Sequence, residues 1–189
     1  MKKNRKNIIL QSLAAMLEEK NMSKITTASL AEKSNITEAA LYRHFPSKRS
    51  IYAELFSFCD DTIFAKCNEL KKEKISAQEK VKKIFIFFML FIEKNKGFAR
   101  LLSREALTYA EQNVSDSVNQ FYERFELVLR QILKEDEKNL KTQAGISAQL
   151  IITVLEGNIG RYIRSKFKDS PSTYIENIWA LLSLSIFKN

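Results

Sequence analysis

The hydroxyl and basic side chains that could bind phosphate gather between residues 26 and 48. Thr26 and Thr27 stand where a short helix is expected to begin, so their hydroxyls and the adjacent backbone N–H groups form a seat for phosphate oxygens. Lys48 lies near the start of a later expected helix, where its charge opposes the helix dipole. This position favours an external anion as its partner. Arg43 suits either a phosphate contact or plain exposure to solvent, and its residue type does not choose between them.

The remaining reactive side chains are too few to form a catalytic or metal site. His44 is the only histidine, and a lone histidine cannot build a zinc site, so a phosphate contact fits it better than a core role. Cys59 and Cys67 are eight residues apart in one expected helix. That spacing separates them by about 12 Å along the axis, too far for a disulfide. Neither a Gly-rich phosphate loop nor a Cys/His pair is found. We therefore expect neither an enzyme nor a bound cofactor or metal ion.

Composition and charge indicate a helical chain with one basic end. Only four Gly and two Pro occur among 189 residues, which leaves little room for β-turns and favours an all-α fold. Residues 1–50 carry ten basic and four acidic side chains, a net charge of +6, whereas the other 139 residues carry 21 and 18, a net charge of +3. A polyanionic partner and a basic surface that serves solubility explain this excess equally well from charge alone.

Apolar spacing and capping residues predict about nine helices. The expected caps are Thr26 or Thr27 for the second helix, and Thr37, Ser47 and Ser76 for later ones, and Gly97 is expected to end a helix. The longest apolar run, residues 84–92, is too short to span a bilayer, and the amino end lacks the apolar stretch of a signal peptide, so a cytoplasmic protein is expected. The predicted helices cover residues 7–20, 28–33, 38–44, 47–74, 76–96, 99–109, 115–135, 142–167 and 171–187.

Two of the short helices, with the turn between them, have the layout of a helix-turn-helix that lays one helix in the major groove. Glu38 to Ala40 would enter the groove first, and the alanines offer only methyl contacts there. The inward side chains are expected to be Leu30, Ala31, Ile36, Leu41 and Phe45. The outward ones are expected to be Thr27, Thr37, Ala39, Tyr42, Arg43 and His44.

The segment from Leu41 to Lys48, Leu-Tyr-Arg-His-Phe-Pro-Ser-Lys, resembles the DNA-binding domain of the TetR superfamily. In that superfamily the recognition helix typically ends in Tyr-x-x-Phe followed by Ser/Asn-Lys. The resemblance implies that Tyr42 contacts phosphate. Many relatives have Gly in the turn where this chain has Asn35, and Asn tolerates the left-handed conformation that such a turn needs. The implied organisation is a DNA-binding domain over residues 1–47 on a helical partner-binding and dimerisation body over residues 48–189.

A narrower resemblance covers nearly the whole chain. It rests on residues 9–14, 38–48, 121–126, 129–133, 156–157 and 161–168 and on the ending from Pro171 to Trp179, which together are similar to nucleoid occlusion factors within that superfamily. The resemblance implies a nucleoid-associated homodimer that binds palindromic double-stranded DNA sites. When DNA-bound, it would antagonise assembly of the tubulin-like division protein FtsZ, so that the septum does not close over the chromosome. No small-molecule ligand is implied. The implied FtsZ-binding groove consists of Phe58, Lys66, Phe87, Leu90, Lys94 and Asn95.

The residues themselves support that groove only in part. Residues 84–92 are apolar all round, which suits either a fully buried helix or one that leaves an apolar groove for a partner segment. Lys66 and Lys94 would suit an acidic or carboxylate-ended peptide, but the family is expected to have Arg at these positions, and Lys cannot pair in the bidentate manner.

Two glycines inside a helix near the carboxyl end indicate a close approach of another helix. Gly157 and Gly160 each cost about 1 kcal/mol relative to Ala in a helix interior. A four-helix dimer interface explains them, and packing within one chain explains them equally well. Two recognition helices must reach grooves about 34–36 Å apart, or a multiple of that distance, so dimerisation is expected. The apolar content of the interface would be Ile152, Leu155, Trp179, Leu182 and Ile186.

A ligand-responsive TetR-type repressor is the alternative function, and it would need an enclosed pocket with several polar groups.

Overall fold

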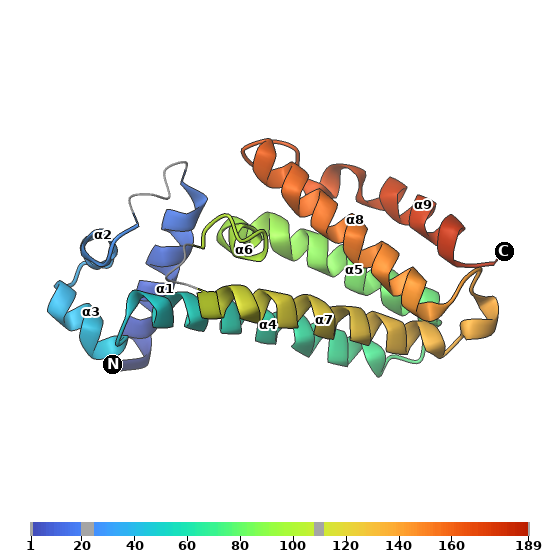
Figure 1. Ribbon diagram of the computed structural model, residues 1–189, viewed down its shortest axis with the longest axis horizontal. Coiled ribbons are helices and arrows are strands. Elements are labelled where there is room, and N and C mark those ends of the chain that lie inside the picture. Colours follow the sequence, from blue (N-terminus) through green and yellow to red (C-terminus); the bar gives the residue numbers. More distant parts are fainter. Residues whose placement is uncertain (1, 20–24, 108–111, 189) are drawn as a thin grey trace. The chain divides into compact units, whose positions relative to one another are not determined.

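The computed structural model describes residues 2–19, 25–107 and 112–188, and the described residues form nine α-helices (Figure 1). The all-α prediction is confirmed. The helices are α1 (Lys2–Glu18), α2 (Thr27–Lys33), α3 (Glu38–His44), α4 (Lys48–Lys71), α5 (Ala77–Lys94), α6 (Lys96–Leu102), α7 (Gln112–Lys134), α8 (Ala144–Arg164) and α9 (Ile175–Ile186).

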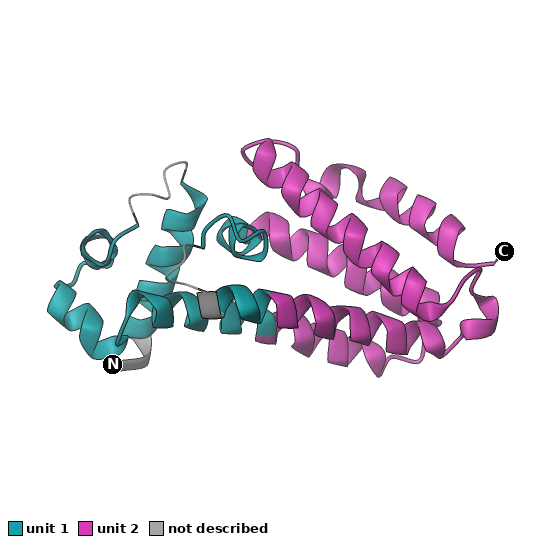
Figure 2. Ribbon diagram, viewed as in Figure 1, with its two compact units in different colours: residues 1–60, 95–118 teal, residues 61–94, 119–189 magenta. Residues whose placement is uncertain are grey.

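The chain divides into two compact units, coloured separately in Figure 2. Unit 1 comprises residues 1–60 and 95–118, and unit 2 comprises residues 61–94 and 119–189. Helices α4 and α7 each contribute residues to both units. Across the described ranges, no helix is both long and apolar enough to cross a membrane.

In unit 1, α1 packs closely on α6, and Gly97 makes this possible. A Cβ atom at Gly97 would lie 2.9 Å from the carbonyl oxygen of Ala14 and 3.1 Å from Cβ of Leu17. The buried Arg100 side chain then donates hydrogen bonds to the carbonyls of Leu17, at 2.8 Å, and Glu19, both at the end of α1. These carbonyls have no partner within the helix, so Arg100 acts as a cap supplied from another element.

The expectation that Gly97 ends a helix is therefore wrong. Helix α5 already ends at Lys94, and Gly97 lies inside α6, where it is selected for close approach and not for a left-handed conformation. The helix predicted over 99–109 begins earlier and its regular part ends at Leu102. The last two residues of that prediction, 108 and 109, lie outside the described residues, as do residues 20–23 at the predicted end of the first helix.

The core of unit 2 is built from aromatic side chains of α5, α7 and α9. The ring of Phe88 lies 5.1 Å from that of Phe125, and the ring of Phe85 lies 5.9 Å from that of Trp179, centroid to centroid. Such pairs add about 0.5–1.5 kcal/mol each beyond the apolar area that they bury. The ammonium group of Lys80, on a buried side chain, pairs with Glu135 at 2.7 Å.

The α8–α9 connection differs from the prediction of two simple helices. Helix α8 stops at Arg164, three residues early, because Lys166 and Phe167 adopt positive φ values of 56° and 62°. The Phe167 ring then packs on Tyr162 at 4.9 Å. Pro171 opens a short 3-10 turn over Pro171–Tyr174, and α9 starts only after it.

The close contact at Gly97 can be tested by substitution. We expect Gly97→Ala to lower the free energy of unfolding by about 1–3 kcal/mol, because the added methyl meets backbone atoms of α1 that cannot yield easily. Urea denaturation followed by circular dichroism would measure the change.

Gly145→Ala is the matched control, since its Cβ would have only Arg130 Cδ nearby, at 3.7 Å. Alanine at this position in α8 should be neutral or stabilising by up to about 1 kcal/mol. Equal effects of the two substitutions would contradict the role assigned to Gly97.

Candidate nucleic-acid interface

The amino end of α2 is fixed by a reciprocal pair of hydrogen bonds. The Ser29 N–H donates to Thr26 Oγ1 at 3.1 Å, and the Thr26 N–H donates to Ser29 Oγ at 2.9 Å. This capping box satisfies two donors that a helix start otherwise leaves unpaired. The prediction that a threonine caps this helix is confirmed, and Thr26 is that residue.

The turn after α2 depends on Asn35. Its φ is 53°, and its N–H donates to the carbonyl of Glu32 at 2.9 Å. The left-handed conformation expected for Asn35 is thus confirmed. Thr37 then caps α3, because its hydroxyl oxygen accepts a hydrogen bond from the Ala40 N–H at 3.2 Å. The two caps and the turn define where α3 begins.

One side of α3 is buried, so only the opposite side can contact a nucleic acid. Leu41 is fully buried and Phe45 nearly so, as are Leu30 and Ala31 of α2. The predicted inward residue Ile36 is half-buried. On the other side Tyr42 is 47% exposed. Thr37, Glu38, Ala39 and Arg43 are also exposed, Thr26 is exposed, and Thr27, His44 and Lys48 are half-buried.

One contact between the two short helices was not foreseen. The Thr27 hydroxyl of α2 donates a hydrogen bond to Oε1 of Glu38 at the start of α3. Thr27 had been expected to offer this hydroxyl to phosphate. The residues are eleven positions apart, so only the geometry of the turn brings them together.

Basic side chains surround the end of α3 and the start of α4. The Lys48 Nζ lies 5.4 Å from the centroid of the Tyr52 ring, which gives its charge a cation–π partner within the chain. An external anion is therefore not the sole reason for a lysine at this helix start. The Lys6 Nζ lies 5.1 Å from the centroid of Phe45, so α1 adds a cation that sequence reasoning did not single out. The basic run at the amino end was the available signal.

The residues of the predicted partner groove are divided between the two units. In unit 1, Phe58 is 64% exposed and borders a hollow of about 240 Å³. The hollow is also lined by Asn7, Leu10, Gln11, Ala14, Leu55, Cys59 and Asn95. Burial, and then the charge of Asp60, raise the pKa of the Cys59 thiol to about 12, so this thiol stays protonated near neutral pH.

In unit 2, the predicted groove residues of α5 share one stripe of the helix. Phe87 is half-buried, Leu90 is 40% exposed and Lys94 is exposed, at spacings of three and four residues. The opposite side of α5 is core: Ile84, Phe85, Phe88, Met89 and Ile92 are buried. The apolar run therefore combines the two alternatives that the sequence left open.

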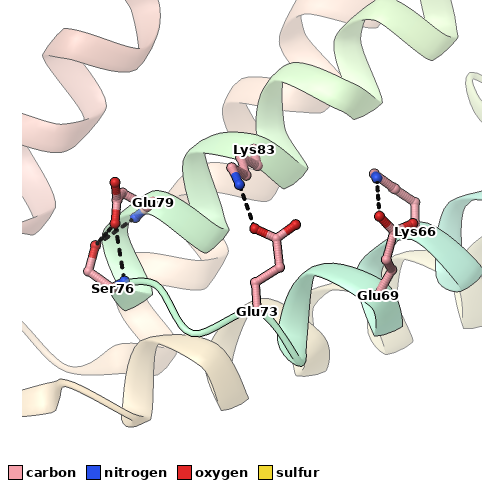
Figure 3. A network of polar contacts seen from close by, with 6 residues as sticks. All are labelled: Lys66, Glu69, Glu73, Ser76, Glu79 and Lys83. Atoms are coloured by element: carbon pink, nitrogen blue, oxygen red, sulfur yellow. Dashed lines mark hydrogen bonds and ion pairs between the residues drawn. The ribbon is translucent and has the colours of Figure 1, made fainter.

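Lys66, the other predicted groove residue of unit 2, has an acidic neighbour on its own helix. Its Nζ pairs with Oε1 of Glu69 at 2.6 Å (Figure 3). Figure 3 also shows the Lys83–Glu73 pair, which joins α5 to the turn that follows α4. A partner carboxylate that binds Lys66 must compete with Glu69.

Glu93 fixes the end of the α5 stripe. Its carboxylate accepts a hydrogen bond from the Ser172 N–H at 3.0 Å. Burial opposes ionisation, but hydrogen bonds from Ser170 and Ser172 and the charge of Lys94 outweigh it and lower the pKa of Glu93. The ionised Glu93 thus lies next to the predicted contact residue Lys94.

The predicted dimer residues lie mostly inside a single chain. Leu155 and Ile186 are fully buried, and Ile152, Trp179 and Leu182 are 5–6% exposed. Leu182 also lines a surface groove between α8 and α9. The other four can supply little contact surface to a second copy, because they already pack within unit 2. The apolar side chains that α8 and α9 expose are others: Ile146 at 54%, Leu150 at 38%, Leu181 at 67% and Leu184 at 57%.

A shallow apolar groove of about 210 Å³ lies between α8 and α9. It is lined by Leu150, Val154, Ile178, Leu181, Leu182 and Ser185. Gly157 is exposed, and a Cβ there would meet nothing within 4 Å, whereas one at Gly160 would meet only the Arg164 guanidinium, at 3.0 Å. Helix periodicity identified the two helices but not which of their faces point outward.

The capped helix pair on a helical body is the architecture of TetR-type DNA-binding regulators. Residues 9–55 match the family described as bacterial regulatory proteins, tetR family. Two solved structures share the fold at low identity: the regulator FadR from Bacillus subtilis in complex with stearoyl-CoA (TM-score 0.79, 16% identity, 95% of this chain and 98% of that one) and the repressor NalD from Pseudomonas aeruginosa (TM-score 0.80, 15% identity, 99% of both chains).

The helices that follow the DNA-binding domain identify the family more narrowly. Residues 76–186 match the SlmA-like type of the family described as Tetracyclin repressor-like, C-terminal domain. The nucleoid occlusion factor SlmA of Vibrio vulnificus strain YJ016 is 38% identical over 190 aligned positions, covering 98% of this chain and 97% of the relative. SlmA of Vibrio cholerae serotype O1 is 37% identical over 188, covering 97% and 96%. The chain belongs to the SlmA family of TetR-type regulators, and it is a DNA-binding regulator, not an enzyme.

The phosphate contact predicted for Lys48 can be measured. We expect Lys48→Ala to weaken binding to every duplex and to reduce the slope of log affinity against log salt by about one unit, because one fewer phosphate is neutralised. Fluorescence anisotropy with labelled duplexes over a range of salt concentrations would give both quantities. Lys138→Ala, which removes an exposed charge in unit 2, should leave the slope unchanged. An unaltered slope for Lys48→Ala would contradict the assignment.

Proposed function

We propose that this protein is a nucleoid occlusion factor that binds palindromic chromosomal sites as a homodimer and, when DNA-bound, antagonises FtsZ assembly. It would thereby block septum formation over the chromosome, acting on the nucleoid in the cytoplasm. The single observation that carries the proposal is similarity to SlmA at 38% identity over 98% of the chain. DNA binding follows from family membership, whereas FtsZ and the dimer are the proposed parts.

Residues 1–47 are proposed as the DNA-reading domain, with Lys48 as the first contact of the body. The exposed face of α3 supports this, because its amino-terminal residues are those that reach base edges in a helix-turn-helix. The proposed contacts are Thr26, Thr37, Glu38, Ala39, Tyr42, Arg43, His44 and Lys48. Thr27, which the sequence also predicted as a contact, is proposed to act through Glu38, to which its hydroxyl donates.

An acidic peptide such as the FtsZ tail is the proposed partner of the groove residues. The α5 stripe offers apolar surface at Phe87 and Leu90 and a cation at Lys94. Phe58 adds an exposed aromatic ring in unit 1. Exposed ion pairs such as Lys66–Glu69 contribute only about 0.2–1 kcal/mol, so a partner carboxylate can replace Glu69 at modest cost.

Lys94→Glu tests the partner. The reversed charge should repel an acidic tail, so we expect the variant to bind DNA as the wild type does but to lose binding to an FtsZ-tail peptide. It should also fail to reduce the amount of FtsZ polymer that sediments in the presence of DNA fragments carrying a bound site.

Lys138→Glu is the control, because it makes the same charge change at an exposed position elsewhere in unit 2. It should behave as wild type in both assays. If wild type and Lys94→Glu bound the tail equally, the groove assignment would be lost. If DNA-bound wild type left FtsZ sedimentation unchanged, the proposed function itself would fail, and a ligand-responsive repressor would become the better hypothesis.

The homodimer is proposed to form through the outward faces of α8 and α9. Leu150 and Leu181 both line the apolar groove between these helices and both are exposed, and soluble monomers seldom leave such a contiguous patch uncovered. The exposed Gly157 and the half-buried Gly160 would let the helices of a second copy approach closely.

A charge in this groove should break the dimer. We expect Leu181→Glu to sediment as a monomer in analytical ultracentrifugation at concentrations where the wild type is a dimer, since a carboxylate cannot be buried there without a partner. Leu127→Glu, on an exposed part of α7, is the matched control and should remain dimeric. A wild type that sediments as a monomer, or a dimeric Leu181→Glu, would refute the proposed interface.

A further inference from the structure

The contact between Thr27 and Glu38 assigns these two residues different roles at the DNA. Building on the proposed function, in which α3 of each protomer reads one half-site, we infer that Glu38 specifies a cytosine in each half-site and that Thr27 is the residue that positions it. The observation is the hydrogen bond from the Thr27 hydroxyl to Oε1 of Glu38, made on the exposed side of the helix pair.

A carboxylate at this place cannot be a phosphate contact. Ionised Glu and phosphate oxygens are both acceptors with negative charge, so they repel each other. The first residues of a recognition helix face base edges, and Glu38 is the first residue of α3. The group on DNA that could bind this carboxylate is therefore a hydrogen-bond donor on a base.

Only two bases present an amino donor in the major groove, and one of them suits a carboxylate better. Adenine presents its N6 donor next to its own N7 acceptor. A side chain that both accepts and donates hydrogen bonds, such as Gln or Asn, therefore fits adenine. Cytosine presents N4 without an acceptor of its own beside it, and Glu is the side chain that accepts from it. Cytosine is thus the base that Glu38 should favour.

In the first turn of α3, the residues next to Glu38 have few groups that could form a hydrogen bond with a base. Ala39 and Ala40 have no polar side-chain atoms, and the oxygen of Thr37 accepts the Ala40 N–H as the helix cap. The side-chain groups of this turn that could form a hydrogen bond with a base edge are the Glu38 carboxylate and the hydroxyl proton of Thr37. Base preference at the position facing Glu38 should then depend strongly on one carboxylate.

Thr27 makes that carboxylate a defined acceptor. Its hydroxyl donates to one oxygen, Oε1, which leaves Oε2 for the base and holds the side chain in one orientation. Because the hydroxyl proton is used in this way, Thr27 acts on specificity through Glu38. A phosphate contact by Thr27 would instead affect all sequences alike.

Selection of binding sites from a random duplex library tests this inference. The proteins compared are wild type, E38Q, E38A, T27V and T27S, each first checked by circular dichroism and thermal unfolding. T27V removes the hydroxyl at nearly constant volume, and T27S restores it.

We expect wild type to select cytosine at one symmetric position of both half-sites, with a preference of roughly 5- to 150-fold over other bases. E38Q should change that position to adenine, and E38A should lose the preference there while keeping the rest of the site. T27V should reduce the preference for cytosine over the other bases several-fold without a uniform loss of affinity. T27S should restore that preference.

The inference would be overturned by a common site for wild type, E38Q and E38A, even if their affinities differed, since Glu38 would then only hold α2 to α3. A wild-type site with no fixed cytosine would overturn it as well. If T27V weakened binding to all sequences equally and kept the cytosine preference, Thr27 would be a phosphate contact and its positioning role would be wrong.

Discussion

The packing of Leu41 and Phe45 against Leu30 and Ala31 is the constraint on which the DNA-reading face depends. These side chains are 0–3% exposed, so α3 cannot rotate without exposing its core. Deleting one large side chain from such a core costs about 2–5 kcal/mol, a large part of the stability of a small domain. With that rotation fixed, Glu38, Ala39 and Tyr42 must point outward. The position of α3 along its own axis is set separately, by the Thr37 cap and by the left-handed Asn35 before it.

The features that sequence predicted well are local ones. A capping threonine, a left-handed asparagine and the long helix after Ser47 each follow from residues within four positions of one another. The features that the sequence did not predict are contacts between distant parts of the chain. The sequence around Gly97 predicts a helix end, because nothing in it shows that α1 passes within contact distance. The Thr27–Glu38 bond was missed for the same reason, since it spans eleven residues.

The dimer helices show a different limit of periodicity. An apolar repeat identifies α8 and α9 as helices with buried faces, but it does not say whether the same chain or a second chain covers each face. Leu155 and Trp179 have the right residue types for an interface and are used within unit 2. Leu181 has the same residue type and is 67% exposed. Only the packing of the chain on itself separates the two sets.

At both the proposed groove and the DNA-reading face, basic side chains attract an anionic partner without selecting it. At the proposed groove, Lys66 and Lys94 stand where the family is expected to have Arg, and a lysine binds a carboxylate as a point charge without a fixed fork. On the α5 stripe, selectivity would then come largely from the apolar side chains of Phe87 and Leu90. At the proposed DNA interface, the cations Lys6, Arg43 and Lys48 would favour any duplex, and their contribution would weaken as salt rises.

In the proposed complex, Glu38 adds a negative charge to a surface that faces phosphate, which would lower the affinity for every sequence. The loss is recovered only where a base donates to the carboxylate. A protein whose activity depends on being DNA-bound needs to occupy a few sites and to leave the bulk of the chromosome empty. An acidic residue at the tip of the recognition helix serves that requirement better than another lysine would, because it weakens non-specific binding while retaining the matched site.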